Sequence, residues 1–169
     1  ITSGIKNTVV TNNFLAQSVE ELQNNSGYVD ASVIEAFRWG LFDPAGIIAK
    51  TTIQGLLDEL TVPNGIGIAR NDDGGAYDSA EWVFMDLRLA GALRNSGVPA
   101  DKDKADLLID WITAQAINNM GLISELHTRE GSKYDGSPPM VGFGAGAYII
   151  ELWHRENGDA PTALCGIEW

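Results

Sequence analysis

The sequence predicts an all-α fold built from paired helices. Apolar residues recur at three- and four-residue spacing in six segments, which is the pattern of helices that bury one face. No stretch shows sustained alternation of apolar and polar residues, so we expect minimal sheet content. Short and long connections alternate between the helical segments. That alternation is typical of stacked αα-hairpins, whose long loops gather at one end.

Three helical segments are expected in the first part of the chain. They cover about residues 12–24, 31–40 and 44–60. Thr11 or Asn12 can cap the first helix, because short polar side chains accept hydrogen bonds from the free N–H groups of a first turn. Pro44 can open the third helix, since the first turn does not use its missing N–H. A long loop rich in glycine and aspartate then runs from Gly65 to about Asp78.

Three more helical segments follow that loop. They cover about residues 79–95, 101–119 and 141–155. A second long loop, from Gly121 to Pro139, precedes the last of them. Loops of this length in a compact domain are usually functional. We therefore expect most of the chemistry in the loops 65–78 and 121–139.

The composition is that of one globular domain. The chain has 169 residues, of which 44% are apolar and 20% charged, so 1–169 is expected to form a single helical unit. A formal net charge of −12 without a basic stripe argues against nucleic-acid binding. No apolar run approaches the roughly 18 residues of a membrane span. The compartment stays open, with an extracellular or periplasmic location favoured over a cytoplasmic one.

Metal and cofactor motifs are not expected in this sequence. No Cys/His spacing typical of zinc sites is present, so we expect no metal and no cofactor. The single cysteine, Cys165, is interpreted as a free thiol. The glycines of residues 142–146 do not follow a strand, and therefore indicate close helix packing rather than a nucleotide site.

The first long loop holds residues suited to binding a sugar. Arg70 and Asp78 can form directional hydrogen bonds to hydroxyl groups, and the rings of Tyr77 and Trp82 can stack on the C–H faces of a sugar ring. A turn or a calcium loop around Asp72-Asp73 is an alternative. The EF-hand pattern is absent, because no glutamate stands at the twelfth position.

The second long loop holds Glu125, at the end of the stretch Gly121-Leu122-Ile123-Ser124-Glu125. Taken alone, this carboxylate is best interpreted as a solvated surface group, and His127 as a structural or surface histidine. The loop contains no Ser-His-Asp or Cys-His arrangement with a recognisable nucleophile elbow. Local sequence therefore does not assign a catalytic role to this loop.

In their order along the chain, these segments resemble the C-terminal half of the catalytic domain of glycoside hydrolase family 15, the glucoamylase and glucodextranase group. The spacing from Arg70 to Trp82 is similar to that from the family's substrate-binding arginine to a tryptophan, and the stretch ending at Glu125 resembles the segment that ends in the catalytic base. Three further blocks are similar in place: residues 26–32, Phe42-Asp43-Pro44 and residues 138–148. The resemblance covers roughly residues 26–154.

The resemblance implies an α/α toroid, with half of an (α/α)6 barrel contributed by this chain. It also implies hydrolysis of α-glucosidic bonds from non-reducing ends with inversion, on an α-glucoside or oligosaccharide substrate. Inversion needs two carboxyl groups, one as acid and one as base. Glu125 would be the catalytic general base. The substrate-binding residues would be Arg70, Tyr77, Asp78, Glu81, Trp82 and Phe143.

The sequence also departs from the family pattern. Phe143-Gly144 stands where many relatives carry a Trp-Ser pair, and Leu126 replaces the glutamine that usually follows the base. The family's general acid lies in an earlier helical pair with a Trp-Glu-Glu-like motif, which is absent upstream of Ser26. We therefore expect the N-terminal half of the catalytic domain to come from a second chain or a missing segment. Two alternatives stay open: a non-catalytic carbohydrate-binding or regulatory helical domain on the same scaffold, and an unrelated six-helix interaction domain.

Overall fold

The computed structural model describes residues 2–140 and 142–158, so Cys165 lies outside the described residues. The elements are, in chain order, α1 (Thr2–Val9), β1 (Val10–Thr11), β2 (Phe14–Leu15), α2 (Val19–Asn24), the 3-10 helix η1 (Ala31–Ile34), α3 (Glu35–Arg38), α4 (Ile47–Leu60), β3 (Glu81–Trp82), α5 (Val83–Arg94), α6 (Pro99–Asn118), β4 (Leu126–His127) and α7 (Phe143–Asn157). Helices dominate, and each strand in this part of the chain has only two residues. The prediction of minimal sheet content is confirmed.

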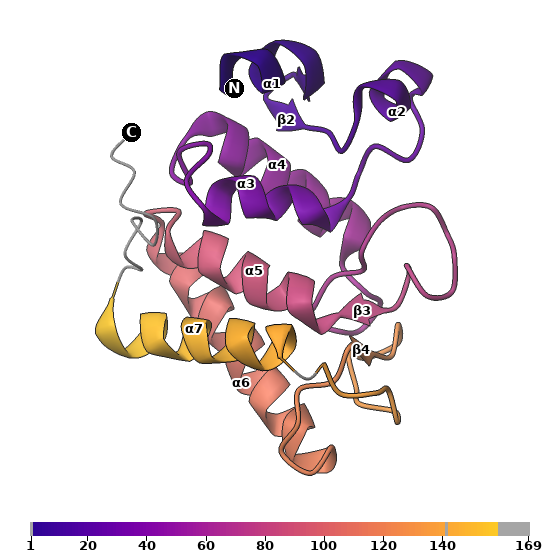
Figure 1. Ribbon diagram of the computed structural model, residues 1–169, viewed down its shortest axis with the longest axis vertical. Coiled ribbons are helices and arrows are strands. Elements are labelled where there is room, and N and C mark those ends of the chain that lie inside the picture. Colours follow the sequence, from indigo (N-terminus) through magenta and orange to yellow (C-terminus); the bar gives the residue numbers. More distant parts are fainter. Residues whose placement is uncertain (1, 141, 159–169) are drawn as a thin grey trace.

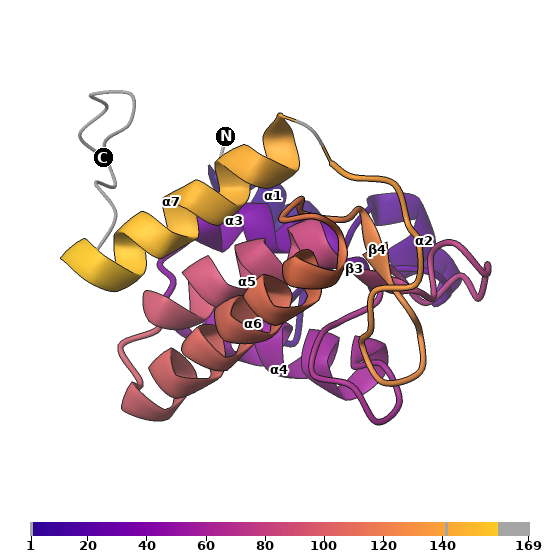
Figure 2. The ribbon, with the colours of Figure 1, turned by 90° about the horizontal axis from the view of Figure 1, so that it is seen from below.

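The helices form two layers. Helices α3, α5 and α7 lie side by side with their N-termini at the same end, on the right in Figure 1. The view from below places α6 and α4 on the other side of α5 (Figure 2). Each of α3 and α5 therefore forms a hairpin with the helix that follows it. The predicted fold class, an all-α fold of the α/α toroid type, is confirmed.

Helix α5 is the centre of the core. Every residue of α5 except Phe84 is buried, because this helix packs against α3, α6 and α7 at once. Leu89, Ala90, Ala92 and Leu93 join a cluster of buried side chains that reaches from β2 to α6, and Leu87 joins a second cluster with residues of α6 and α7. Burial on all sides also encloses three charged residues of α5, Asp86, Arg88 and Arg94, which must find partners inside the protein.

The N-terminal region differs from the prediction. Residues 10–15 form a hairpin rather than the start of a helix, with Val10 paired to Leu15. Asn12 and Asn13 make its two-residue turn in the left-handed conformation, with φ of 49° and 67°. Asparagine tolerates that conformation better than most residues, and such turns match the twist of paired strands. The helix expected from about residue 12 was therefore wrong in its first half.

The helix in this region begins at Val19, about seven residues later than expected. Ser18 is the N-cap of α2, and its side chain accepts a hydrogen bond of 3.2 Å from the Glu21 N–H. Thr11 and Asn12 are not caps. A further helix, α1, was not expected from the sequence. The other helices occupy the predicted segments, although their ends are shifted by a few residues.

Strands β3 and β4 join the two long loops. Glu81 pairs with His127 and Trp82 with Leu126, in antiparallel register. The pairing brings the loop before α5 against the loop before α7, at the N-terminal ends of α3, α5 and α7 (Figure 1). Two stretches about 45 residues apart in sequence thus meet at one end of the helical layer. Residues 126–127 lie in the second predicted loop, whereas residues 81–82 were expected in the first turn of a helix and form a strand instead.

Candidate active site

Glu125 lies where the two long loops meet. Its backbone N–H donates to the Pro138 carbonyl at 2.9 Å, and its carbonyl accepts from the Val83 N–H at 3.3 Å. The half-buried side chain accepts a hydrogen bond of 2.6 Å from the Tyr77 hydroxyl to Oε1. Val83 is the first residue of α5, so the backbone of Glu125 is fixed directly to the rigid core. The carboxylate is held in a defined position at the rim of the fold.

Tyr77 is the residue of the first loop that reaches Glu125. The hydrogen bond to Glu125 raises the pKa of the Tyr77 hydroxyl, because the neutral phenol donates to the carboxylate and the phenolate cannot. Tyr77 therefore stays a hydrogen-bond donor to Glu125 throughout the neutral pH range. The two loops touch through their side chains here as well as through the backbone of β3 and β4.

Trp82 holds the first loop in shape. Its indole Nε1–H donates to the Tyr77 carbonyl at 3.1 Å, and the two rings pack edge to face with centroids 4.9 Å apart. The Arg70 guanidinium lies 5.2 Å from the centroid of the Trp82 ring, within cation–π range. Arg70 also forms an ion pair of 3.3 Å with Asp78 and approaches Asp30 to 4.0 Å. The loop thus presents a guanidinium, two aromatic rings and a carboxylate beside Glu125.

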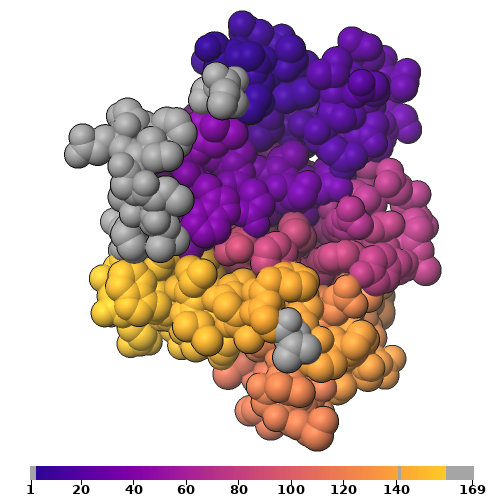
Figure 3. Space-filling model, viewed as in Figure 1, coloured from indigo at the N-terminus to yellow at the C-terminus, as the bar shows by residue number. Residues whose placement is uncertain are grey.

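The two loops are neighbours on the molecular surface. In Figure 3 the magenta loop before α5 and the orange loop before α7 lie against each other at the right-hand edge. The structure brings together most of the residues that the sequence singled out. They are Arg70, Tyr77, Asp78, Trp82 and Glu125.

Glu81 and Phe143 lie elsewhere. Glu81 is 0% exposed, and its carboxylate points into the protein, where Oε1 is 2.7 Å from Nδ1 of His127. Phe143 is exposed at the start of α7 and packs edge to face on Phe84, with centroids 5.2 Å apart. No contact joins either side chain to Glu125 among the hydrogen bonds and ring contacts of residues 2–140 and 142–158.

Asp86 was missed from the sequence, although it lies directly behind this surface. Burial raises the pKa of Asp86 well above its ordinary range, and the neighbouring charge of Glu81 raises it further. The sequence contained a sign of this residue, because Asp86 stands between the apolar stretch Val83-Phe84-Met85 and the apolar Leu87. Only the all-round burial of α5 distinguishes such an aspartate from a solvated one.

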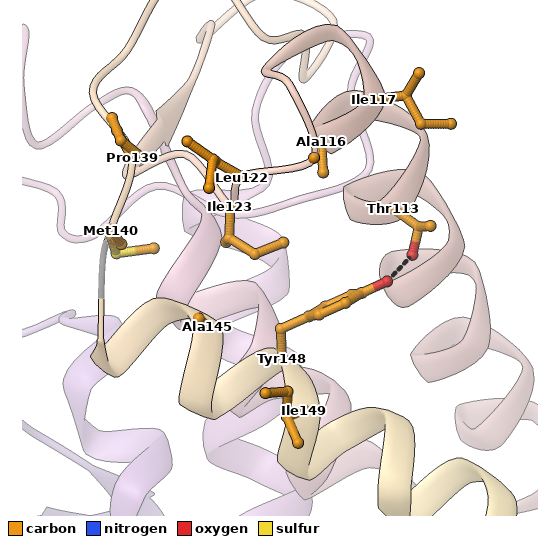
Figure 4. A pocket seen from close by; sticks show the side chains of 11 residues that line it. Thr113, Ala116, Ile117, Leu122, Ile123, Pro139, Met140, Ala145, Tyr148 and Ile149 are labelled. Atoms are coloured by element: carbon orange, nitrogen blue, oxygen red, sulfur yellow. Dashed lines mark hydrogen bonds between the residues drawn. The ribbon is translucent and has the colours of Figure 1, made fainter.

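A separate pocket lies between α6 and α7 (Figure 4). Its lining is mostly aliphatic, including Ile117, Leu122, Met140 and Ile149, and the described residues bring no carboxylate or histidine to it. The pocket therefore does not have the groups of an acid–base site. Across the described part of the chain, no three His, Cys, Asp or Glu side chains are grouped so that they could hold a metal ion. No helix there is both long and apolar enough to cross a bilayer.

Several solved structures that share this fold are glycosidases. A wild-type glycosidase matches 92% of this chain with a TM-score of 0.72 and 22% sequence identity. A phenylalanine-to-tyrosine variant matches with a TM-score of 0.73, and a glutamate-to-alanine variant in complex with glucose with a TM-score of 0.71 and 20% identity. The chain spans 42% of the length of each of these structures. No protein-family model and no curated protein sequence matches it. The chain thus has the fold of one part of a glycosidase.

Proposed function

We propose that this chain supplies the general base of an inverting glycoside hydrolase that acts on α-glucosidic bonds, with Glu125 as the base. The observation that carries this proposal is the position of the Glu125 carboxylate. The backbone of Glu125 is anchored to α5, and its carboxylate accepts from the Tyr77 hydroxyl at 2.6 Å. The Tyr77 ring packs against Trp82, whose own ring lies 5.2 Å from the Arg70 guanidinium. A catalytic carboxylate must be held in this way while it stays within reach of a bound water molecule.

In the proposed reaction, Glu125 takes a proton from a water molecule, whose oxygen attacks the anomeric carbon. The bond from that carbon to the glycosidic oxygen breaks on the opposite face, and a general acid protonates the leaving oxygen. Because the Tyr77 hydroxyl occupies Oε1, the water would approach Oε2. In inverting enzymes the acid and base lie about 6.5–9.5 Å apart, which leaves room for the water.

Arg70, Asp78, Tyr77 and Trp82 would bind the glucosyl unit. The guanidinium and carboxylate of the Arg70–Asp78 pair suit sugar hydroxyls, while the two rings offer apolar faces. One glycosidase with this fold was solved in complex with glucose, which supports a sugar ligand for the corresponding surface. Phe143 would belong to a more distant wall of the site, since its exposed ring packs on Phe84 in the first turn of α5.

The general acid would come from the rest of the catalytic domain, as a second chain or a further segment. Two observations support this part of the proposal. The glycosidases of this fold are more than twice as long as this chain. Exposed aliphatic side chains, including Ile117 and Ile149, surround the pocket between α6 and α7 (Figure 4), and such a surface suits packing against further helices.

The test is Glu125→Gln in the complete protein that contains this chain. Glutamine keeps the size of the side chain and can still accept from Tyr77, but it cannot take a proton from water. We expect kcat for α-glucosides to fall by about 10²–10⁴-fold, the usual contribution of a general base, with sugar binding largely retained. Glu130→Gln, an exposed glutamate of the same loop, is the matched control and should leave kcat unchanged.

Near-normal turnover by Glu125→Gln would show that Glu125 is not the base. A complete wild-type protein that binds sugars but hydrolyses none would instead support a non-catalytic carbohydrate-binding domain on this scaffold.

A further inference from the structure

A cluster of three buried polar side chains lies directly beneath the candidate site. Glu81, Asp86 and His127 are 0%, 0% and 3% exposed. None of them has a role in the reaction proposed above. Buried ionisable groups are costly unless they are paired, so a cluster of this composition requires a physical explanation.

The three side chains contact one another. His127 Nδ1 lies 2.7 Å from Glu81 Oε1, and a Glu81 carboxylate at this distance selects the tautomer that carries the proton on Nδ1. A Cβ atom added at Gly67 would lie 2.4 Å from both Asp86 Oδ2 and the Glu81 carboxyl carbon, so the two carboxyl groups are neighbours. Glu81 Oε2 and Asp86 Oδ2 are buried, and neither has a hydrogen-bond partner among the groups of residues 2–140 and 142–158 as long as both carboxyl groups are ionised. One proton held between these two oxygens satisfies both.

The protonation of Asp86 fits this arrangement. Burial and the charge of Glu81 hold the pKa of Asp86 well above its ordinary range, so its carboxyl group keeps a proton where a solvated aspartate has lost it. The protonated group can donate to Glu81 while its other oxygen accepts from the Ile68 N–H at 2.8 Å. Both carboxyl groups of the cluster then have hydrogen-bond partners without an added cation.

The cluster ties together the three segments that carry the site. Asp86 holds the backbone of Ile68, two residues before Arg70, and the Ile68 carbonyl accepts from the Trp82 N–H at 2.9 Å. Glu81 belongs to β3, directly before Trp82, and His127 belongs to β4, two residues after Glu125. The segments that carry Arg70, Trp82 and Glu125 are therefore anchored on the same buried group.

The register of β3 against β4 depends on this anchor. Each strand has two residues, so few backbone hydrogen bonds specify the pairing. Side chains alternate between the two faces of a strand, and a slip by one residue would turn Glu81 outward and Trp82 inward. Such a slip would break the Glu81–His127 hydrogen bond and bury an indole in place of a carboxyl group.

We infer that Glu81, Asp86 and His127 are positioning residues, which fix β3 against β4 and thereby hold Glu125 in contact with Tyr77. The catalytic consequence rests on the proposed function of Glu125, whereas the positioning itself does not. Displacing a catalytic group by about 1 Å can cost on the order of 100-fold in rate. Loss of the anchor should therefore lower kcat much more than it raises KM.

The experiment compares Glu81→Ala with Glu81→Gln in the complete protein. Glutamine can still accept from His127 and donate to Asp86, so Glu81→Gln should keep kcat within about threefold of the wild type, whereas Glu81→Ala should lower it about 100-fold. The matched control is Glu151→Ala, because Glu151 is equally buried and also bonded to a histidine, but lies at the other end of the helical layer. It should lower stability without the selective loss of kcat.

A second readout does not depend on catalysis. Spectrophotometric titration of the tyrosines, with Tyr77→Phe to identify the Tyr77 component, should show Tyr77 titrating above the ordinary value of about 10 in the wild type and in Glu81→Gln. In Glu81→Ala the component should move back toward about 10. If Glu81→Ala does not fold, His127→Leu replaces it, with the same expected shift.

The outcomes separate the two ideas. An unchanged Tyr77 titration in both Glu81→Ala and His127→Leu would overturn the positioning role. Normal turnover by Glu125→Gln, together with a shifted Tyr77 titration in Glu81→Ala, would overturn the proposed function alone. A loss of kcat in Glu151→Ala as large as in Glu81→Ala, at equal loss of stability, would reduce the effect to general destabilisation and also overturn the inference.

Discussion

Two buried glutamate–histidine pairs lie at opposite ends of α5, and they are neutralised in different ways. Near its N-terminus, Glu81 and His127 share their enclosure with Asp86, a second acid. Toward its C-terminus, Glu151 is bonded to His154 at 3.2 Å and to the Arg38 guanidinium at 2.9 Å. The far cluster contains its own cation, whereas the near cluster depends on a proton held between two carboxyl groups.

The two clusters differ in whether their buried charges are balanced by a cation. The Arg38–Glu151–His154 cluster is charge-balanced and joins α3 to α7 across α5, which suits a structural role. The Glu81–Asp86–His127 cluster keeps two carboxyl oxygens that only a shared proton can satisfy, and it lies beneath Glu125. Perturbed titratable groups are enriched at functional sites, although structural networks produce them too.

The largest effect is expected from removing the cation of the far cluster. Arg38→Met keeps much of the side-chain volume but leaves the Glu151 carboxylate buried without its ion pair. Breaking a buried pair in this way costs about 3–5 kcal/mol. Urea denaturation of the variant and the wild type measures the change in unfolding free energy. A loss below about 1 kcal/mol would mean that the two clusters do not differ in the way described.

The second prediction concerns two glycines, Gly67 and Gly91, whose backbone lies directly against the side chains of the two clusters. A Cβ atom at Gly67 would lie 2.4 Å from Asp86 Oδ2, and one at Gly91 would lie 2.5 Å from Arg38 Nε. Each glycine-to-alanine change should destabilise the fold by about 1–3 kcal/mol through overpacking. The control is Gly146→Ala in α7, where no atom lies within 4 Å and alanine should stabilise the helix by up to about 1 kcal/mol. Equal stability of all three variants in thermal unfolding would contradict the prediction.

The smallest effect is the pH dependence of stability, which should have opposite signs at the two clusters. Because the pKa of Asp86 is raised in the folded protein, its contribution is fully present below 3.8 and is lost as pH rises through the folded value. Burial, followed by the charge of Arg38, lowers the pKa of His154, so its contribution is present above 6.5 and is lost as pH falls through the lower folded value.

Asp86→Asn tests this contrast. Asparagine can accept from the Ile68 N–H and donate to Glu81 without a proton that titrates. The unfolding free energy of Asp86→Asn is measured between about pH 4 and pH 8. The wild type should lose stability as pH rises above the unfolded pKa of Asp86, and the variant should not. Both proteins should lose stability as pH falls below 6.5, because His154 is unchanged. A wild-type curve that matches that of Asp86→Asn at every pH would show that Asp86 does not hold a proton.

Much of the fold could be predicted because a helix leaves a pattern in the local sequence. The apolar spacing in the segments of α4, α5, α6 and α7 is set by 3.6 residues per turn, and that repeat is visible in sequence. The region 10–15 was predicted wrongly because Val10 and Leu15 fit a hairpin as well as a helical stripe. The Asn12-Asn13 turn decided between them.

The sequence by itself determined the helical segments and the two long loops between them, because periodicity and turn residues are local properties. Residue chemistry also singled out Arg70 and Trp82, whereas Glu125 became a candidate only through the order and spacing of segments that resemble a known family. Only the tertiary structure decided that Tyr77 reaches Glu125 across 48 positions, and that Glu81 points inward to His127 while its neighbour Trp82 faces the site. The physical reason is that a two-residue strand has no readable alternation, so its inward and outward faces are set by the partner strand and by the buried groups that lock the pairing.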